Sequence, residues 1–584
     1  MTPETISYLE TEITGGFWKE KQDLIKDVTL DAVYNRFSET GRIGAFKLNF
    51  ADGGPEPHIF YDSDVAKWME SVAYLTAKRR TPEQEARVDF IVDCIERGRL
   101  ENGYFNSYFQ QMAPDRIFSD RDAHELYCAG HLLEAAVEYY RATGKDKMLR
   151  LMTDYMEYIR KVFVEDDSAA FSSPGHEEIE LALVKLFDLT GERRWLDLAS
   201  HFVDMRGRGT KPGRDSSHST YNQDHLPVRE QFTAEGHAVR ACYLYCAMAD
   251  LALRLGDEEL KTACRRIFEN IVNRKMYVTG GIGSTAEGER FEGDFVLPND
   301  TAYAETCASI ALALFARRMS LIDTDAKYAD VAERVIYNGF LSGLSLDGRL
   351  FFYENAQEID LKSREKHPET HYPITQRVEL FNCSCCPPNI TRFILSIADF
   401  LYVYDGTTLF VNQYMDSVSH SDGLEIRQKT RYPLDGNVEI TVSRDIRLAL
   451  RIPGWCGEYR VFVNGAPACG EPEKGYLYLE VRGGDEVTLL LRMTPKINYA
   501  DPRVDADRGC AAVSYGPLVM CAEEVDNPSL NETVLKHGEM TVANGVFGLP
   551  AVTVQADPAP LYMIPYHAFA NRGESDMKIW IRKE

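Results

Sequence analysis

Two short segments of the chain together supply a glutamate and several cysteines at spacings that suit a metal ion. They are Glu305-Thr306-Cys307 and Cys383-Ser384-Cys385-Cys386-Pro387-Pro388. One carboxylate and three thiolates would make a four-ligand site suited to zinc. The alternative is ordinary buried cysteine, which we expect for most of the other nine cysteines. Spacing alone favours structural zinc over catalysis, because a closed four-ligand site normally lacks an open position.

Both segments are predicted to lie where a helix begins. Glu305 and Cys307 open the run AETCASIALALFARRM. In a regular helix, residues i and i+2 point about 200° apart, so these two can share a metal only at a helix start or in extended chain. Cys385 and Cys386 precede Pro-Pro-Asn and the apolar run ITRFILSIADFLYVY, which we expect to be helical. The N-terminus of a helix stabilises a thiolate, so this position favours reactive sulfur.

A third unusual segment is the loop from Thr279 to Thr301. A connection of about 20 residues inside a compact helical domain is usually functional. Its carboxylates are Glu287, Glu289, Glu292, Asp294 and Asp300. The Gly-Gly-Ile-Gly-Ser-Thr start lacks the lysine and the preceding strand of a phosphate-binding loop, so phosphate binding is not expected. By sequence alone, each single carboxylate is more simply a solvated loop charge.

Helical periodicity dominates the first 400 or so residues that must position these segments. In Glu177 to Leu189, apolar residues recur at helical spacing and Gly191 follows as a helix-ending glycine. The same pattern ends at Gly144 and at Gly256. About a dozen such segments in series predict helical hairpins, and six hairpins can close into an (α/α)6 barrel. A solenoid is the alternative, but the irregular insert Arg206 to Gln231 and the absence of a fixed period favour the barrel.

Near residue 402 the pattern changes to short alternating runs typical of strands. The runs LEIRQKT, NVEITVS, IRLALRIP and EVTLLLRM are separated by turn residues, and Asn464-Gly465 predicts a hairpin turn. The sequence therefore predicts a multidomain α and β protein. We assign a helical barrel to residues 1–401, a β-sandwich domain to 402–498 and a short C-terminal β-rich domain to 499–584.

Composition limits the partners of the chain. Its 584 residues carry a net charge of −25, and an acidic surface repels nucleic acid and anionic membranes. The chain contains 31 tyrosines and 28 phenylalanines, and tyrosine suits sugar recognition because it combines a flat apolar face with a hydroxyl. No signal peptide and no membrane span are apparent, and the 13 cysteines lack disulfide-scaffold spacing. We therefore expect a cytoplasmic protein with reduced thiols.

At these residues the sequence resembles glycoside hydrolase family 127, the β-L-arabinofuranosidase family. The matching stretches cover nearly the whole chain in order. The combination of ETCA with CCPPN is highly specific, whereas the β-strand motifs alone are not. The stretches are Tyr127-Cys128 through Gly130-His131, GHEEIELALVKL, EGHAVRACYLY, GGIGST…GERF…LPNDTAYAETCAS, FNCSCCPPNI, LRIPGWC and GPLVMCAE.

The resemblance implies an (α/α)6 catalytic barrel followed by β-sandwich, jelly-roll-like domains. It also implies an exo-acting, anomer-retaining glycosidase that releases terminal β-L-arabinofuranose, with Zn²⁺ as cofactor and cysteine as nucleophile. By position, Cys385 matches the nucleophile and Glu289 the general acid/base. The matching zinc ligands are Glu305, Cys307, Cys385 and Cys386, and the matching sugar contacts are His131, His176, His237 and Tyr353.

Three alternatives stay open at this point. The same machinery could act on another unusual sugar. The chain could instead be an (α/α)6 hydrolase or lyase that uses paired carboxylates and a structural zinc. It could also be a carbohydrate-binding protein without catalysis. The expected partner in every case is a small carbohydrate, and a homodimer is a further candidate partnership.

Overall fold

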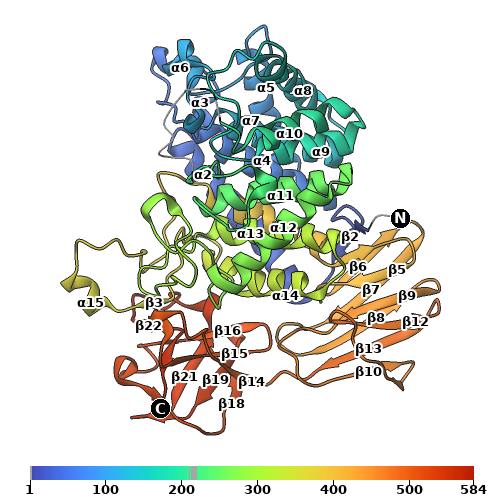
Figure 1. Cartoon of the computed structure of the whole chain (residues 1–584), viewed down its shortest axis with the longest axis vertical. Coiled ribbons are helices and arrows are strands. Elements are labelled where there is room, and N and C mark those ends of the chain that lie inside the picture. The colour runs from blue at the N-terminus through green and yellow to red at the C-terminus, as the bar shows by residue number, and fades with distance from the viewer. Residues whose placement is uncertain (1–2, 210, 212–219) are drawn as a thin grey trace. The chain divides into compact units, whose positions relative to one another are not determined.

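The computed structural model describes residues 3–209, 211 and 220–584 (Figure 1). Contacts between Cα atoms divide the chain into two compact units. One unit comprises residues 25–270 and 379–396, and the other comprises residues 1–24, 271–378 and 397–584. Among the described residues, no helix is both long enough and apolar enough to cross a membrane.

The unit of residues 25–270 and 379–396 is helical. Four hairpins pair neighbouring helices in sequence, which confirms the predicted series. In each hairpin the first helix is buried along most of its length, whereas the second buries one face. The hairpins are α4 (Tyr61–Lys78) with α5 (Pro82–Gly98), α7 (Glu125–Thr143) with α8 (Lys147–Arg160), α9 (Ile179–Thr190) with α10 (Arg193–Met205), and α11 (Ala238–Leu255) with α12 (Glu258–Asn270).

Glycine ends three of these helices as predicted. Gly144, Gly191 and Gly256 follow α7, α9 and α11 with φ of 72°, 70° and 67°, the left-handed region that glycine adopts without strain. Gly130, inside α7, has a different role. A Cβ atom there would lie 2.8 Å from the Cα of Ile179, so glycine permits the close approach of α7 to the start of α9.

The last helix of this unit, α16 (Cys386–Leu395), is shorter than the sequence predicts. The apolar run that was expected to be helical as far as Tyr404 leaves the helix after Leu395. It continues as a 3-10 turn at Ile397–Phe400 and as strand β4 (Tyr402–Tyr404). The prediction was wrong at this end because antiparallel pairing of β4 with β5 (Thr408–Val411) takes precedence over the local helical pattern.

The other unit contains the hairpin of α13 (Thr306–Ile322) with α14 (Ala326–Arg334) and the sheets of the C-terminal half (Figure 1). One sheet joins β1 (Glu4–Thr5), β4, β5, β9 (Ile446–Arg451) and β12 (Tyr476–Val481). A second sheet joins β11 (Ala466–Ala468), β10 (Tyr459–Val463), β13 (Glu486–Leu491), β8 (Asn437–Val442), β7 (Leu424–Thr430), β6 (Ser417–Ser421) and β2 (Thr11–Ile13).

The predicted hairpin turn at Asn464-Gly465 is present between β10 and β11. Both residues have positive φ, at 51° and 77°, and Val463 pairs with Ala466 across the turn. The third sheet follows the order β14 (Pro495–Asn498), β15 (Cys510–Tyr515), β16 (Leu518–Glu523), β21 (Leu561–Pro565), β19 (Pro550–Val554) and β18 (Thr541–Asn544). The chain is thus a helical region followed by β-sheet domains.

Three very short strands that were not predicted from the sequence pair with strands of these sheets. β1 pairs with β4 and β2 pairs with β6, so the N-terminal segment contributes to both sheets formed by residues 402–491. β3 (Glu358–Ile359) pairs with β22 (Met577–Lys578). Strands of two or three residues are too short for alternation to reveal, and only their long-range partners define them.

Candidate active site

Glu305 and Cys307 lie at the start of α13, as predicted. Glu305 is the N-cap residue, with extended backbone angles (φ −57°, ψ 138°), and the helix begins at Thr306. The backbone N–H of Thr306 donates to the carbonyl oxygen of Tyr353 over 2.9 Å, and its hydroxyl donates to the carbonyl of Phe352 over 2.9 Å. The helix start is therefore fixed to the segment that carries Tyr353.

Cys385 and Cys386 lie at the start of α16. Cys385 is the N-cap residue, Cys386 is the first helical residue, and the two prolines occupy the first turn, where a missing N–H costs nothing. The preceding loop is fixed by Arg42, which donates to the carbonyl oxygens of Asn382 (2.7 Å) and Phe381 (3.2 Å). Arg42 is itself paired with the buried carboxylate of Asp64 at 3.0 Å.

A buried ion network fixes α16 within its helical unit. Nη1 of Arg392 lies 2.6 Å from Glu70 Oε2 and 2.8 Å from Glu134 Oε2, and Nη2 donates to the hydroxyl of Tyr243 over 3.0 Å. Nζ of Lys185 lies 3.2 Å from Oε1 of Glu70 and 2.8 Å from Oε1 of Glu134. Buried charges are tolerated only when they are paired, and this pairing specifies one position for the helix.

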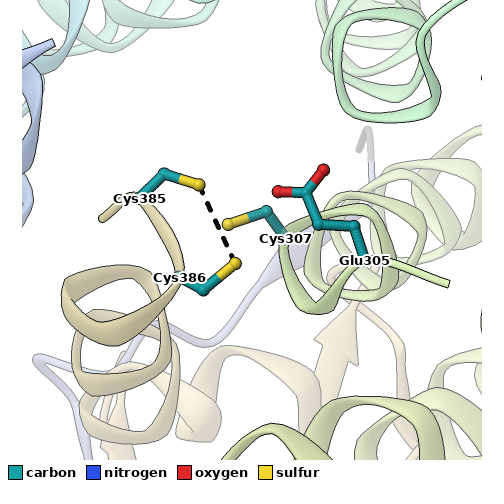
Figure 2. Close-up of side chains that lie close together, drawn as sticks. All are labelled: Glu305, Cys307, Cys385 and Cys386. Atoms are coloured by element: carbon teal, nitrogen blue, oxygen red, sulfur yellow. Dashed lines mark hydrogen bonds between the residues drawn. The ribbon is translucent and has the colours of Figure 1, made fainter. Parts of the chain in front are cut away.

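Glu305, Cys307, Cys385 and Cys386 come together in the structure (Figure 2). One ligand atom from each residue lies within 4.8 Å of all the others, and the sulfur atoms of Cys385 and Cys386 are 3.8 Å apart. All four residues are buried, and Cys385 is the most accessible at 9%. Three soft sulfurs and one carboxylate form a donor set that fits zinc. The group does not include Cys383.

Glu289 lies in the irregular loop that the sequence analysis singled out. It is half-buried and has a φ of 52°, which is unusual for a residue other than glycine. The hydroxyl of Tyr353 donates to its Oε2 over 3.3 Å. Glu289 also groups with His237 and Glu305, because one potential ligand atom from each lies within 4.8 Å of the others. Backbone strain of this kind is common at functional sites.

His237 is the N-cap residue of α11, and its ring is oriented by the helix. Its Nδ1 accepts hydrogen bonds from the backbone N–H groups of Val239 (3.2 Å) and Arg240 (3.4 Å). These bonds occupy the Nδ1 lone pair, so the neutral ring carries its proton on Nε2 and can donate from that atom.

His131 and His176 are buried among aromatic rings. The ring centroid of Tyr127 lies 4.5 Å from that of His131 and 4.1 Å from that of His176, and the ring centroids of His176 and His237 are 5.6 Å apart. Burial, aided by nearby cations, lowers the pKa of His131 and of His176 well below the ordinary value, so both rings are neutral at neutral pH. His176 Nδ1 lies 2.9 Å from the carbonyl oxygen of Glu177, which fixes this nitrogen as a donor.

Two further residues of this histidine cluster were not predicted as site residues. His124 has a left-handed backbone (φ 63°) just before α7, and its ring lies 5.8 Å from that of His176. Tyr127 contacts both predicted histidines. Tyr127 stands in a motif that carries the family resemblance, which was the available signal. Nothing in the sequence distinguishes His124 from an ordinary loop histidine.

Comparison with known proteins identifies the chain as a glycoside hydrolase. Residues 10–399 match the family model described as "Beta-L-arabinofuranosidase, GH127 catalytic domain". Residues 408–493 match the GH127 middle domain and residues 495–582 the family's C-terminal domain. The chain belongs to glycoside hydrolase family 127.

Similar proteins are known over the full length of the chain. A non-reducing end β-L-arabinofuranosidase of Bifidobacterium longum subsp. longum is 35% identical over 98% of this chain and 100% of its own length. The crystal structure of a GH127 β-L-arabinofuranosidase from Geobacillus stearothermophilus T6 is 40% identical, with a TM-score of 0.92, over 98% of this chain and 100% of that chain. A solved GH127 β-arabinofuranosidase is 32% identical, with the same TM-score, over 100% and 98% of the two chains.

Proposed function

We propose that the protein is a zinc-dependent, exo-acting, anomer-retaining β-L-arabinofuranosidase. It would release terminal β-L-arabinofuranose from oligosaccharides or glycoconjugates. The observation that carries the proposal is the convergence of Glu305, Cys307, Cys385 and Cys386 in one buried cluster. The names of the relatives at 35% and 40% identity support the sugar.

Glu305, Cys307, Cys385 and Cys386 would hold the zinc ion. When bound, zinc would keep cysteine sulfur in the thiolate form at neutral pH. Cys385 is the candidate nucleophile because it is the most accessible of the three cysteines and lies at the N-terminus of α16, where the helix dipole favours negative charge. The cluster itself is buried, which keeps water from competing at the sulfur.

Hydrolysis would proceed by double displacement. In the first step, the Cys385 sulfur attacks C1 of the sugar while the carboxylic acid of Glu289 donates its proton to the departing oxygen. The sulfur–carbon bond forms as the glycosidic bond breaks. In the second step, the Glu289 carboxylate takes a proton from water, the water oxygen attacks C1, and the sulfur leaves as thiolate. Two inversions at C1 give net retention.

The histidines and Tyr353 would orient the sugar. Nε2 of His237 is a donor because its Nδ1 is occupied by backbone N–H groups. Nε2 of His176 is an acceptor in the neutral ring, since its Nδ1 donates to Glu177. His131 and Tyr353 complete the proposed contacts. Donors and acceptors in fixed positions suit sugar hydroxyls, each of which can do both.

Three further parts of the proposal concern architecture and context. The helical region would be an (α/α)6 barrel, and the sheets of the C-terminal half would be sandwich-like with jelly-roll topology. The chain would act in the cytoplasm on imported oligosaccharides. It would take a small carbohydrate as partner and no nucleic acid or membrane, and it would form a homodimer.

One observation favours a second candidate mechanism. Glu289 and Glu305 offer oxygen atoms within 4.8 Å of one another, so the two carboxyl groups are near enough to act as the carboxylate pair of a retaining glycosidase. In this alternative, Glu305 would be the nucleophile and zinc would have no catalytic role. The two mechanisms share stereochemistry but differ in the atom that bonds to the sugar.

A substrate screen tests the function itself. The purified protein should hydrolyse p-nitrophenyl β-L-arabinofuranoside faster than other p-nitrophenyl pentosides and hexosides, and NMR should show β-L-arabinofuranose as the first-formed sugar. An inverted first product would contradict the double displacement. Sugar binding without turnover of any furanoside would favour a carbohydrate-binding protein.

A further inference from the structure

An exposed histidine and a half-buried glutamate form a pair beside the proposed general acid. His371 Nε2 lies 2.9 Å from Glu354 Oε2, within hydrogen-bond distance. The His371 side chain is 57% exposed and that of Glu354 is 16% exposed. Glu354 directly follows Tyr353, whose hydroxyl donates to Glu289. Neither residue has a part in the mechanism described above.

Glu354 lies close enough to Glu289 for their charges to interact. Burial raises the pKa of Glu354 above its ordinary value, and the negative charge of Glu289 adds to that increase. Glu305 is 2% exposed, Glu289 and Glu354 are both half-buried, and the side chain of His371 is 57% exposed. The pair therefore extends from the neighbourhood of the general acid toward solvent at His371.

The segment that carries His371 is fixed rather than loosely attached. The guanidinium of Arg364 lies 4.9 Å from the ring centroid of Tyr372, and its Nη1 donates to the carbonyl of Pro373 over 2.6 Å. Nη2 of Arg364 donates to the carbonyl of Glu358 over 3.3 Å. These contacts hold both residues that follow His371, so the backbone beside it is fixed, and the bond to Glu354 orients its ring.

The general acid of a glycosidase delivers its proton to the leaving-group oxygen, so groups beyond the acid on its solvent side face the leaving group. On this basis, and resting on the function proposed above, we infer that Glu354 and His371 form a leaving-group subsite for a second sugar. Glu354 retains acceptor capacity beyond its bond to His371, and the second ring nitrogen of His371 remains for a hydroxyl. The pair thus suits a leaving group rich in hydroxyls rather than an apolar aglycone.

The test compares two substrates that differ only in the leaving group. One is a disaccharide of β-L-arabinofuranose linked to a second arabinose, and the other is p-nitrophenyl β-L-arabinofuranoside. His371→Ala should lower kcat/KM for the disaccharide about tenfold, the effect of one lost hydrogen bond to a polar partner. It should change kcat/KM for the aryl glycoside by less than about threefold, because that leaving group lacks hydroxyls.

His367→Ala is the matched control. This histidine lies in the same segment, has the same 57% exposure and faces a different carboxylate, Glu369, at 3.5 Å. This variant should leave kcat/KM unchanged for both substrates. If His371→Ala lowered kcat/KM equally for both substrates, or for neither, the subsite would be refuted while the proposed function stood. If the unaltered enzyme hydrolysed neither substrate, the proposed function would fail first.

Discussion

The hydroxyl of Tyr353 donates a hydrogen bond to Oε2 of Glu289 over 3.3 Å, between a residue after α14 and a residue of the long loop before α13. The segment carrying Tyr353 also accepts the hydrogen bonds that fix the start of α13 at Thr306. One short segment therefore orients the proposed general acid and the helix start that presents Glu305 and Cys307.

Removing this hydroxyl should disturb catalysis without disturbing the fold. We expect Tyr353→Phe to lower kcat/KM about tenfold, because one hydrogen bond to an ionisable group is lost while the ring remains. Thermal unfolding should be nearly unchanged. Tyr499→Phe is a suitable control, since Tyr499 is 60% exposed. Equal activities of the two variants would contradict a catalytic role for the hydroxyl of Tyr353.

Replacing Glu289 should have a larger effect that depends on the leaving group. Glu289→Gln cannot donate the proton, so kcat/KM, which reports the first step, should fall about 10²–10⁴-fold for sugar leaving groups and much less for p-nitrophenol. Glu287→Gln serves as control, because Glu287 lies in the same loop but is 86% exposed and paired with Arg290. A loss independent of the leaving group would argue against proton donation by Glu289.

Metal analysis tests the proposed ligand cluster. The purified protein should contain about one zinc per chain, and chelation should lower both Tm and activity, because ligands that bind only the folded state stabilise it. Cys307→Ser should lower the zinc content. Cys469→Ser, which alters an exposed cysteine, should not. Full zinc occupancy in the Cys307 variant would place the metal elsewhere.

A buried aspartate of the helical unit predicts a pH dependence of stability. Burial raises the pKa of Asp62 from 3.8 to about 6, although hydrogen bonds from Ser107 oppose the shift. As pH rises from about 4 to about 6, Asp62 ionises in the unfolded chain but stays protonated in the folded one. The free energy of unfolding should therefore fall over this range, by up to about 3 kcal/mol.

Asp62→Asn removes this titration and keeps an oxygen to accept the 2.8 Å hydrogen bond from the N–H of Ser107. Denaturant titrations at both ends of the range should show the variant gaining stability relative to the unaltered protein as pH rises. Asp52→Asn, at an exposed site, should show no such gain. A parallel pH dependence for Asp62→Asn and the unaltered protein would contradict the assignment.

The local parts of this structure follow from local sequence signals. Glycines 144, 191 and 256 end the helices where predicted, and both cysteine-bearing segments lie at helix starts. These features depend on backbone geometry within a few residues. The end of α16 at Leu395 and the strands β1 and β2 depend on distant pairing partners, and periodicity within one segment does not contain that information.

The choice among similar residues also depends on distant contacts. Glu287 and Glu289 are two residues apart and chemically alike, but only Glu289 groups with His237 and Glu305. Cys383 and Cys385 are likewise close in sequence, and only Cys385 enters the ligand cluster. The family resemblance pointed to the residues that cluster, whereas composition and spacing alone left these pairs unresolved.

The most direct test of the account is to identify the atom that bonds to the sugar. Glu289→Gln should accumulate the glycosyl-enzyme with p-nitrophenyl β-L-arabinofuranoside, because this leaving group needs little acid assistance while the second step lacks its base. Peptide mapping by mass spectrometry after a rapid acid quench should find one anhydropentose on Cys385. A sugar found on Glu305, or no adduct despite a burst of p-nitrophenol, would contradict nucleophilic attack by Cys385.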